Sequence, residues 1–298
     1  MKVVVPYTMT DAILSSSTVA ETDHAAWNSA TAYNVGDKVI RTSTHRIYEA
    51  VDGSTNKTPE TEPDYWLDLG ATNRWKMFDN KVGTKTTATT SMTIELKPDR
   101  FVSAVALLEL SASSVTVTVE HPVDGEIYSS TEELTAPISV SDWWYYFFEP
   151  QVPKTTAYFM DVPGSVGSTI SVTVTGATGT TVECGVLLVG DVIVFADAVR
   201  YGARVGIVDY SRKTVDDWGN TEIVERSWSK SGNWTFMLQR NMVDLFQFTL
   251  AGLRARPALY IGSDIYEATT IYGFFKNFDV LIEYPTFSQC SIELEGLI

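Results

Sequence analysis

The chain has little positive charge for its length. Its 298 residues include 22 Lys and Arg against 37 Asp and Glu, which leaves a formal net charge of −15. Residues 1–75, 76–190 and 191–298 carry net charges of −4, −7 and −4, so the acidity is spread along the chain. Because no region is basic, we expect no surface that follows nucleic-acid phosphates. Binding to acidic phospholipid is disfavoured for the same reason.

Cysteines and long apolar stretches are also scarce. Cys184 and Cys290 are far apart in the sequence, which excludes a CxxC metal or redox centre. Both lie in apolar or alternating runs, which favours two buried free thiols, although one long-range disulfide stays open. The longest apolar stretch, Val186–Ala198, is interrupted by a glycine and two aspartates, so membrane insertion is not expected. Met1–Asp11 does not resemble a signal peptide, and we expect synthesis in a cytoplasm.

The usual motifs of catalysis and cofactor binding are missing. There is no GxGxxG, and the glycine-rich run Gly176–Thr181 has no Walker lysine and is typical of a hairpin turn. His24, His45 and His121 have no HxxxH or HxxE partner that would suggest zinc. Adjacent carboxylates such as Asp216-Asp217 could serve glycoside hydrolysis, but 37 carboxylates make such pairs expected by chance. We therefore predict no catalytic residue, no metal and no cofactor, and a protein that is not an enzyme.

The middle of the chain shows the clearest structural pattern. Val115–Glu120 and Thr169–Thr175 alternate apolar and polar residues with a period of two, as half-buried strands do. Further β-rich runs are separated by Gly- and Pro-containing turns: Thr86–Leu96, Phe101–Leu110, Thr155–Asp161 and Thr181–Val189. This pattern predicts an antiparallel β-sandwich, jelly-roll-like in type, over residues 76–190.

The last region, residues 191–298, mixes helix and strand patterns. Asn241–Ala255 has apolar residues at helical spacing, an acid near its start and Pro257 beyond its end. Flanking strands are predicted at Gly232–Leu238, Ala258–Ile261, Ile271–Phe275, Val280–Tyr284 and Ser291–Leu294. We expect an α+β domain with one helix here, and a mainly β protein as a whole. Residues 1–26 show no clear period and are interpreted as an N-terminal arm or a docking segment.

Exposed aromatic residues are the candidates for partner contacts. Six aromatic residues in a row occupy 143–148 and cannot all face one core, so one face is expected to meet a partner or a ligand. We assign interface roles to its first four members, Trp143, Trp144, Tyr145 and Tyr146. Trp218, Trp228 and Trp234 could also anchor an interface, although core packing is favoured for Trp234.

Residues 27–70 form a compact aromatic module within a predicted domain of residues 27–75. The chain reads Trp27, then Tyr33-Asn-Val-Gly-Asp-Lys-Val39, Tyr48-Glu-Ala50, Pro59 and Tyr65-Trp66. This order and spacing resemble the small carbohydrate-binding module of bacterial chitinases, the family 5/12 type. Gly36-Asp37 predicts a tight turn between two short strands, and the aromatic residues would supply most of so small a core.

The resemblance implies a sugar-binding platform made of Trp27, Tyr33, Tyr48 and Trp66. The same four residues are also needed for the core of the module. The chitinase modules usually carry a further aromatic residue just before the loop proline, whereas the loop Ser54–Pro59 has none. We therefore favour a structural module over an active lectin, because a fold does not carry its function with it.

The residues that follow the module extend the resemblance. Asn73–Asp79 is similar to a junction found in tail proteins of tailed bacteriophages, and Glu283–Leu297 is similar to the end of such proteins. This implies a virion component at the tail tip, baseplate or fibre attachment point, made in the host cytoplasm. The implied partners are other tail proteins and copies of itself, with host surface glycans left open as a further partner. The alternatives are a host-binding adhesin and, less favoured, a polysaccharide-degrading enzyme.

Overall fold

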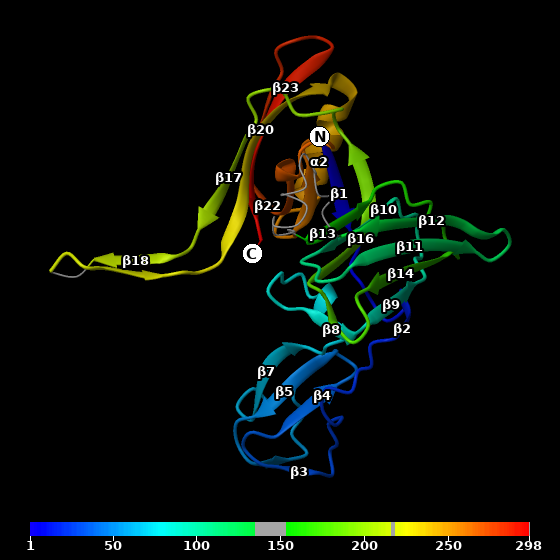
Figure 1. Cartoon of the computed structure of the whole chain (residues 1–298), viewed down its shortest axis with the longest axis vertical. Helices are drawn as coiled ribbons and strands as arrows, with labels where there is room; N and C mark the ends of the chain where they lie inside the picture. The colour runs from blue at the N-terminus through cyan, green and yellow to red at the C-terminus, as the bar shows by residue number, and fades with distance from the viewer. Residues whose placement is uncertain (135–152, 216–217, 298) are drawn as a thin grey trace, which may run out of the picture. The chain divides into compact units, whose positions relative to one another are not determined.

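The protein is mainly β. The computed structural model describes residues 1–134, 153–215 and 218–297. They form antiparallel sheets and a single α-helix, as the sequence predicted (Figure 1). The chain divides into two compact units: unit 1 contains Met1–Thr8 and Val189–Ile298, and unit 2 contains Met9–Leu188. Within the described ranges, no helix has the length and apolar character needed to cross a bilayer.

Unit 2 contains the aromatic module and the predicted sandwich region. Its elements are β2 (Leu14–Ser17), β3 (Ala32–Tyr33), β4 (Lys38–Arg41), β5 (Arg46–Ala50), β6 (Ser54–Thr55), β7 (Trp66–Ala71), η1 (Lys76–Phe78), β8 (Thr86–Thr89), β9 (Ser91–Leu96), β10 (Ala104–Leu108), β11 (Ser114–His121), β12 (Gly125–Glu133), β13 (Thr156–Phe159), β14 (Thr169–Thr175) and β15 (Thr181–Cys184). β16 (Val186–Val194) begins in unit 2 and ends in unit 1.

The main sheet of unit 2 follows from the period-two pattern. Its order is β12-β11-β14-β9-β2, with antiparallel neighbours. Val117 lies opposite Val172, which lies opposite Ile94, and all three side chains are buried. Threonines between these positions point to the other face, where Thr93 and Thr173 contact each other at 3.1 Å between their hydroxyl oxygens. The alternation therefore separates one apolar face from one polar face.

Two of the predicted strands are interrupted in the structure. Thr86–Leu96 is split into β8 and β9 at Thr90, whose φ is 68°. Thr181–Val189 is split into β15 and β16 at Gly185, where a Cβ atom would lie 2.7 Å from the Cβ of Glu109. A local turn and a close backbone approach thus divide stretches whose composition favours strand throughout.

Unit 1 is built on one large sheet and one helix. Besides β1 (Lys2–Pro6) and the end of β16, its elements are β17 (Arg204–Asp209), β18 (Arg212–Val215), β19 (Thr221–Val224), β20 (Trp228–Gln239), η2 (Arg240–Met242), α2 (Val243–Gly252), β21 (Ala258–Ile261), η3 (Glu267–Thr269), β22 (Thr270–Leu281) and β23 (Phe287–Gly296). Within this unit the strand order is β16-β1-β21-β22-β23-β20-β17, and every pair is antiparallel.

The core of unit 1 lies between this sheet and α2. Trp234, Phe236 and Leu238 alternate along β20 and are fully buried. Phe246 of α2 packs against Phe236 with ring centroids 5.6 Å apart, and Leu250 lies in the same cluster. The helix is shorter than the predicted Asn241–Ala255, because residues 240–242 form a 3-10 turn and the helix ends at Gly252.

The beginning of the chain belongs to the sheet of unit 1. β1 pairs with β16 on one side and with β21 on the other, with Val3 and Val4 fully buried. A Cβ on Gly190 would lie 2.1 Å from the carbonyl oxygen of Val5, so only glycine lets the two strands approach this closely. This differs from the predicted division, which assigned residues 1–26 to an arm of their own.

The C-terminal strands are longer than predicted. Ile271–Phe275 and Val280–Tyr284 were expected as two strands, whereas the structure has one continuous β22 that ends at Leu281. A register shift between Phe275 and Asn277 accommodates the polar residues that separated the two patterns.

Both cysteines are free and buried, as the sequence favoured. Cys184 lies in unit 2 and Cys290 in unit 1. Burial raises the pKa of each thiol to about 12, so both remain protonated at neutral pH.

Phe246 tests the importance of the contact between the helix and the sheet. Phe246→Ala removes a fully buried ring, and we expect it to lower the free energy of unfolding of unit 1 by about 3–5 kcal/mol. The matched control is Phe248→Ala on the same helix, whose side chain is 79% exposed and whose loss should have little effect. Chemical denaturation measures both. Equal losses in the two variants would contradict the described core.

Candidate functional site

The first candidate site is the aromatic module, where the structure brings the predicted sugar-binding residues together. The module consists of the three-stranded sheet β4-β5-β7 and the short pair β3-β6. Tyr33, Tyr48 and Trp66 are buried in its core with Val39 and Ala50. The rings of Tyr33 and Trp66 meet edge to face, with centroids 5.1 Å apart and planes at 71°. Three of the four predicted residues therefore build the module.

Polar atoms of these aromatic residues also hold the module together. The indole N–H of Trp66 donates to the carbonyl oxygen of Lys57 at 3.0 Å. The hydroxyl oxygen of Tyr33 accepts from the backbone N–H of Asn28 at 2.7 Å. The predicted turn is present at Gly36, whose φ is 90° and whose N–H donates to Ala50. Tyr33 and Trp66 are thus fixed at both the apolar body and the polar tip of the side chain.

Trp27 differs from the other three because it is only partly buried. The guanidinium carbon of Arg41 lies 4.9 Å from the centroid of its ring. Arg41 in turn donates to Glu60 at 2.7 Å, so the cation is held over the indole. Of the four residues, Trp27 is the one that retains surface for an external ligand, with a cation already against its ring. Sugar binding by this set stays a prediction.

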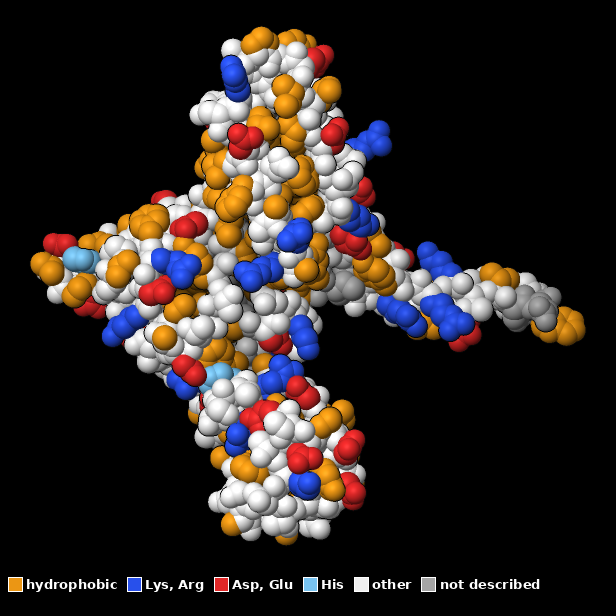
Figure 2. All heavy atoms as spheres, turned by 180° about the vertical axis from the view of Figure 1, so that it is seen from behind, with side chains coloured by type: hydrophobic (Ala, Val, Ile, Leu, Met, Phe, Trp, Pro, Cys, Tyr) orange, Lys and Arg blue, Asp and Glu red, His pale blue; other side chains and the backbone are white. Residues whose placement is uncertain are grey.

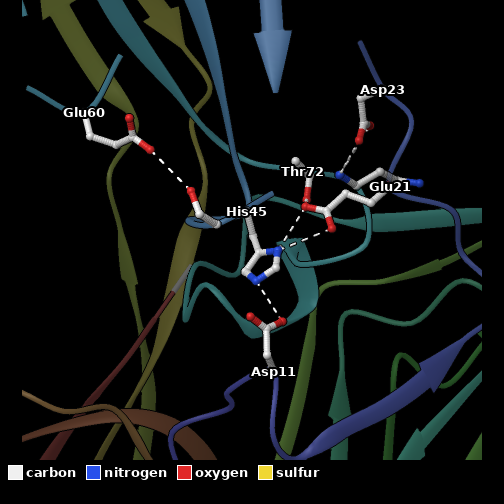
Figure 3. A network of polar contacts seen from close by, with 8 residues as sticks. Asp11, Glu21, Asp23, His45, Glu60 and Thr72 are labelled. Carbon is white, nitrogen blue, oxygen red and sulfur yellow. Dashed lines mark hydrogen bonds and ion pairs between the residues drawn. The ribbon is translucent and has the colours of Figure 1, made fainter. Parts of the chain in front are cut away.

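A second polar cluster surrounds His45 at the turn between β4 and β5 (Figure 3). The Nδ1 atom of His45 lies 3.0 Å from Glu21, and its Nε2 atom lies 2.9 Å from Asp11. The imidazole also stacks on Trp75, with ring centroids 4.0 Å apart and planes at 18°. Glu21 accepts a further hydrogen bond from the hydroxyl of Thr72 at 2.9 Å. His45 thereby connects the module to the segments before and after it in the chain.

The segment that follows the module is held by its own hydrogen bonds. The backbone N–H of Asn73 donates to Asp23, and its side-chain amide exchanges hydrogen bonds with the backbone of Thr87. The hydroxyl of Thr86 donates to the carbonyl oxygen of Asn73 at 2.7 Å. Met77, in the same segment, is fully buried. The module therefore joins the rest of unit 2 through a defined joint and not through a free linker.

The polar groups of these clusters bind mainly one another. Across the three described stretches, no group of three or more His, Cys, Asp or Glu side chains is placed to hold a metal ion. The carboxylates around His45 are engaged by Thr72 and His45 itself, as Figure 3 shows. The arrangement is that of a structural joint.

The predicted aromatic interface at Trp143, Trp144, Tyr145 and Tyr146 lies outside the described residues. The three tryptophans of the last region are described. Trp234 is fully buried, as favoured, whereas Trp218 is 90% exposed and Trp228 is 52% exposed.

The third candidate site is a two-stranded ribbon that leaves the sheet of unit 1. It comprises residues 204–215 and 218–230, in which β17 pairs with β20 and β18 pairs with β19 (Figure 1). Every described residue of β18 and β19 is exposed. Figure 2 shows apolar side chains and Lys or Arg side chains along it. A two-stranded ribbon with both faces in water is only marginally stable, which suggests that another surface covers it.

One face of the ribbon continues the core face of the sheet. The buried residues Gly232, Trp234 and Phe236 share a side of β20 with Lys230 and Trp228, because side chains alternate along a strand. Val205 lies opposite Gly232, and Ile207 lies opposite Lys230, so both belong to the same side. Val205 is 48% exposed and Ile207 is 65% exposed. The apolar face of the sheet therefore continues beyond the part that α2 covers.

Sequence reasoning found Trp218 and Trp228 but missed the ribbon that carries them. No strand was predicted between residues 199 and 231. The available signal was the placement of Val205, Ile207, Val215 and Ile223 between charged residues on both sides of a Trp-Gly turn.

Comparison with known proteins gives no further guide to the site. No protein-family model matches the chain, and no curated protein shows a significant match.

The two roles of the module aromatics can be separated by mutation. Trp66→Ala removes a buried ring and a hydrogen bond, and we expect the module to lose about 3–5 kcal/mol of stability and to unfold. Trp27→Ala removes a partly exposed ring, so the module should stay folded. NMR spectra report folding, and binding to chitin and to host cells reports the lectin function. Loss of binding in a folded Trp27→Ala variant would favour the adhesin.

Glu21 tests the joint around His45. Glu21→Ala removes the acceptor of Thr72 and one partner of His45, and its side chain is 10% exposed. We expect a loss of about 1–3 kcal/mol in the stability of unit 2. The control is Asp11→Ala, whose side chain is 73% exposed and whose loss should change stability by less than about 1 kcal/mol. Thermal unfolding measures both, and equal effects would argue against the joint.

Proposed function

We propose that the protein is a structural subunit of a multi-protein particle, specifically of the tail of a tailed bacteriophage. The observation that supports a subunit of a multi-protein particle is the exposed apolar face of the ribbon, formed by Val205, Ile207 and Trp228. Solitary exposed apolar residues are common on soluble proteins, but several on one face that prolong a core face, here with Lys230 among them, favour a contact surface. A chain that associates with neighbours would cover it.

The tail assignment rests on the resemblance of residues 27–79 to a module and junction found in tail proteins. The burial of Tyr33, Tyr48 and Trp66 supports a structural use of this module. The hydrogen bonds of Asn73 support the same use, because they hold the junction to the rest of unit 2. In this role the module is a rigid appendage that positions neighbouring tail proteins.

Incorporation into particles tests this function. The double variant Ile207→Ser with Trp228→Ala removes apolar side chains that are already exposed, so the chain should fold as before. In a complementation assay, we expect purified tails to contain the unaltered chain and to lose most of the variant. Mass spectrometry of the tails measures both amounts.

Tyr201→Ala is the matched control, because its side chain is fully exposed but lies outside the ribbon. It should be incorporated like the unaltered chain. Absence of the unaltered chain from tails would overturn the tail assignment. Full incorporation of the double variant would overturn the role of the ribbon.

A further inference from the structure

Unit 1 has an apolar groove at the end of β20 that lies away from the ribbon. The groove has a volume of about 550 Å³. Its apolar walls are Phe195, Met237, Leu238, Met242 and Phe287, and Asp197, Arg200 and Gln239 add polar groups. The volume is within the range of pockets that enclose drug-sized molecules. Met237 and Met242 have flexible side chains that adapt to an inserted group.

The ribbon carries side chains that suit such a groove. Trp218, at the turn between β18 and β19, is 90% exposed, and Val215 and Ile223 beside it are 64% and 63% exposed. Tryptophan is the side chain most enriched among residues that dominate interface energies, especially when it enters a pocket. Tyr210 holds the base of the ribbon, because its hydroxyl donates to Glu295 at 2.8 Å.

The ribbon and the groove of one chain cannot meet. The ribbon leaves β20 at Trp228, whereas the groove involves Met237, nine residues further along the same strand. At ~3.3 Å per residue, the two points are separated by about 30 Å. β18 and β19 continue away from the sheet (Figure 1), so the ribbon tip lies still further from the groove. The ribbon tip can therefore enter such a groove only in another copy of the chain.

The apolar area of the ribbon is sufficient for a stable contact. Tyr210, Trp218 and Trp228 are 39%, 90% and 52% exposed. A whole aromatic side chain presents 150–250 Å², so these three expose roughly 350 Å² together. Five exposed aliphatic residues add to this: Val205, Ile207, Val215, Ile223 and Val224. The total approaches the ~800 Å² that each partner contributes to a standard interface.

Charge also permits a second copy as the partner. Residues 204–230 contain five basic and five acidic residues, so the ribbon region is neutral, while the rest of the chain carries the whole net charge of −15. Two acidic bodies repel each other when they approach. A neutral ribbon bearing Arg212, Lys213 and Arg226 can contact an acidic neighbour without that repulsion.

We propose that the ribbon of one copy of this chain docks into the groove at the end of β20 of the next copy. Trp218 is the anchor, and the contact joins two different surfaces, so copies associate head to tail. Such a contact repeats from chain to chain and closes into a ring or continues as a filament. This inference rests on the proposed function and names the partner.

Two variants test the docking. The ribbon variant is Trp218→Ala with Ile223→Ser, and the groove variant is Met237→Gln with Phe287→Ser. Analytical ultracentrifugation of the full chain measures association. We expect the unaltered chain to associate as its concentration rises, and each variant to associate at least about 30-fold more weakly. Circular dichroism and thermal unfolding check that the variants are folded, and Phe248→Ala serves as the control that associates normally.

Mixing the two variants gives the decisive measurement. The groove variant keeps an intact ribbon, and the ribbon variant keeps an intact groove, so an equal mixture should form dimers and nothing larger. Continued monomers in the mixture would overturn head-to-tail docking, as would an unaltered chain that stays monomeric at every soluble concentration. Weakening by the ribbon variant alone would overturn the groove as the docking site.

The outcome separates this inference from the proposed function. If the chain does not self-associate but its ribbon is still needed for incorporation into tails, the ribbon binds a different tail protein. The structural role then stands and the second copy is overturned. If the chain self-associates as described but is absent from tails, the tail assignment fails and the docking stands.

Discussion

One apolar face of β20 must be kept from water, and the fold does this for only part of the strand. From Gly232 to Leu238 the face is covered by α2 and by the first strand of the chain, with Phe236 and Phe246 in contact. β23 lies beside β20 and β22 lies beside β23, and they contribute Ile292 and Phe278 to the same core. Toward Trp228 the cover ends, while Val205, Ile207 and Trp228 continue the apolar pattern around Lys230. Our proposal is that another chain covers this part of the face.

In unit 2 the constraint is the small size of the aromatic module. A module of fewer than 50 residues buries too little apolar surface to be strongly stable alone. Here three aromatic side chains form the core, and hydrogen bonds from Trp66 and to Tyr33 hold the polar tips. The joint around His45 then attaches the module to the neighbouring segments of the same unit. Such attachment suits a positioning role, since a module on a free linker could not orient a partner.

Local sequence patterns predicted the elements in which buried and exposed residues alternate regularly from end to end. Period-two alternation located β11 and β14, and the spacing of apolar residues located α2 within a few residues at each end. The prediction was weaker where one position changes the backbone. Thr90 and Gly185 each interrupt a run of good strand formers, and a register shift after Phe275 joins two runs into one strand. Propensity averages over a window and does not detect such single positions.

The candidate surfaces also differ in whether local sequence patterns or long-range pairing determines them. The aromatic spacing of residues 27–66 was enough to predict a small β module and its core, because the residues that form it are close in the sequence. The pairing of Lys2–Pro6 with strands nearly 200 and 260 residues away was not predictable, since nothing local specifies a distant partner. Trp218 and Trp228 could be named as exposed aromatics. Which face Trp228 occupies, and that this face prolongs the core, depended on long-range strand register, because register assigns each side chain to one side of a sheet.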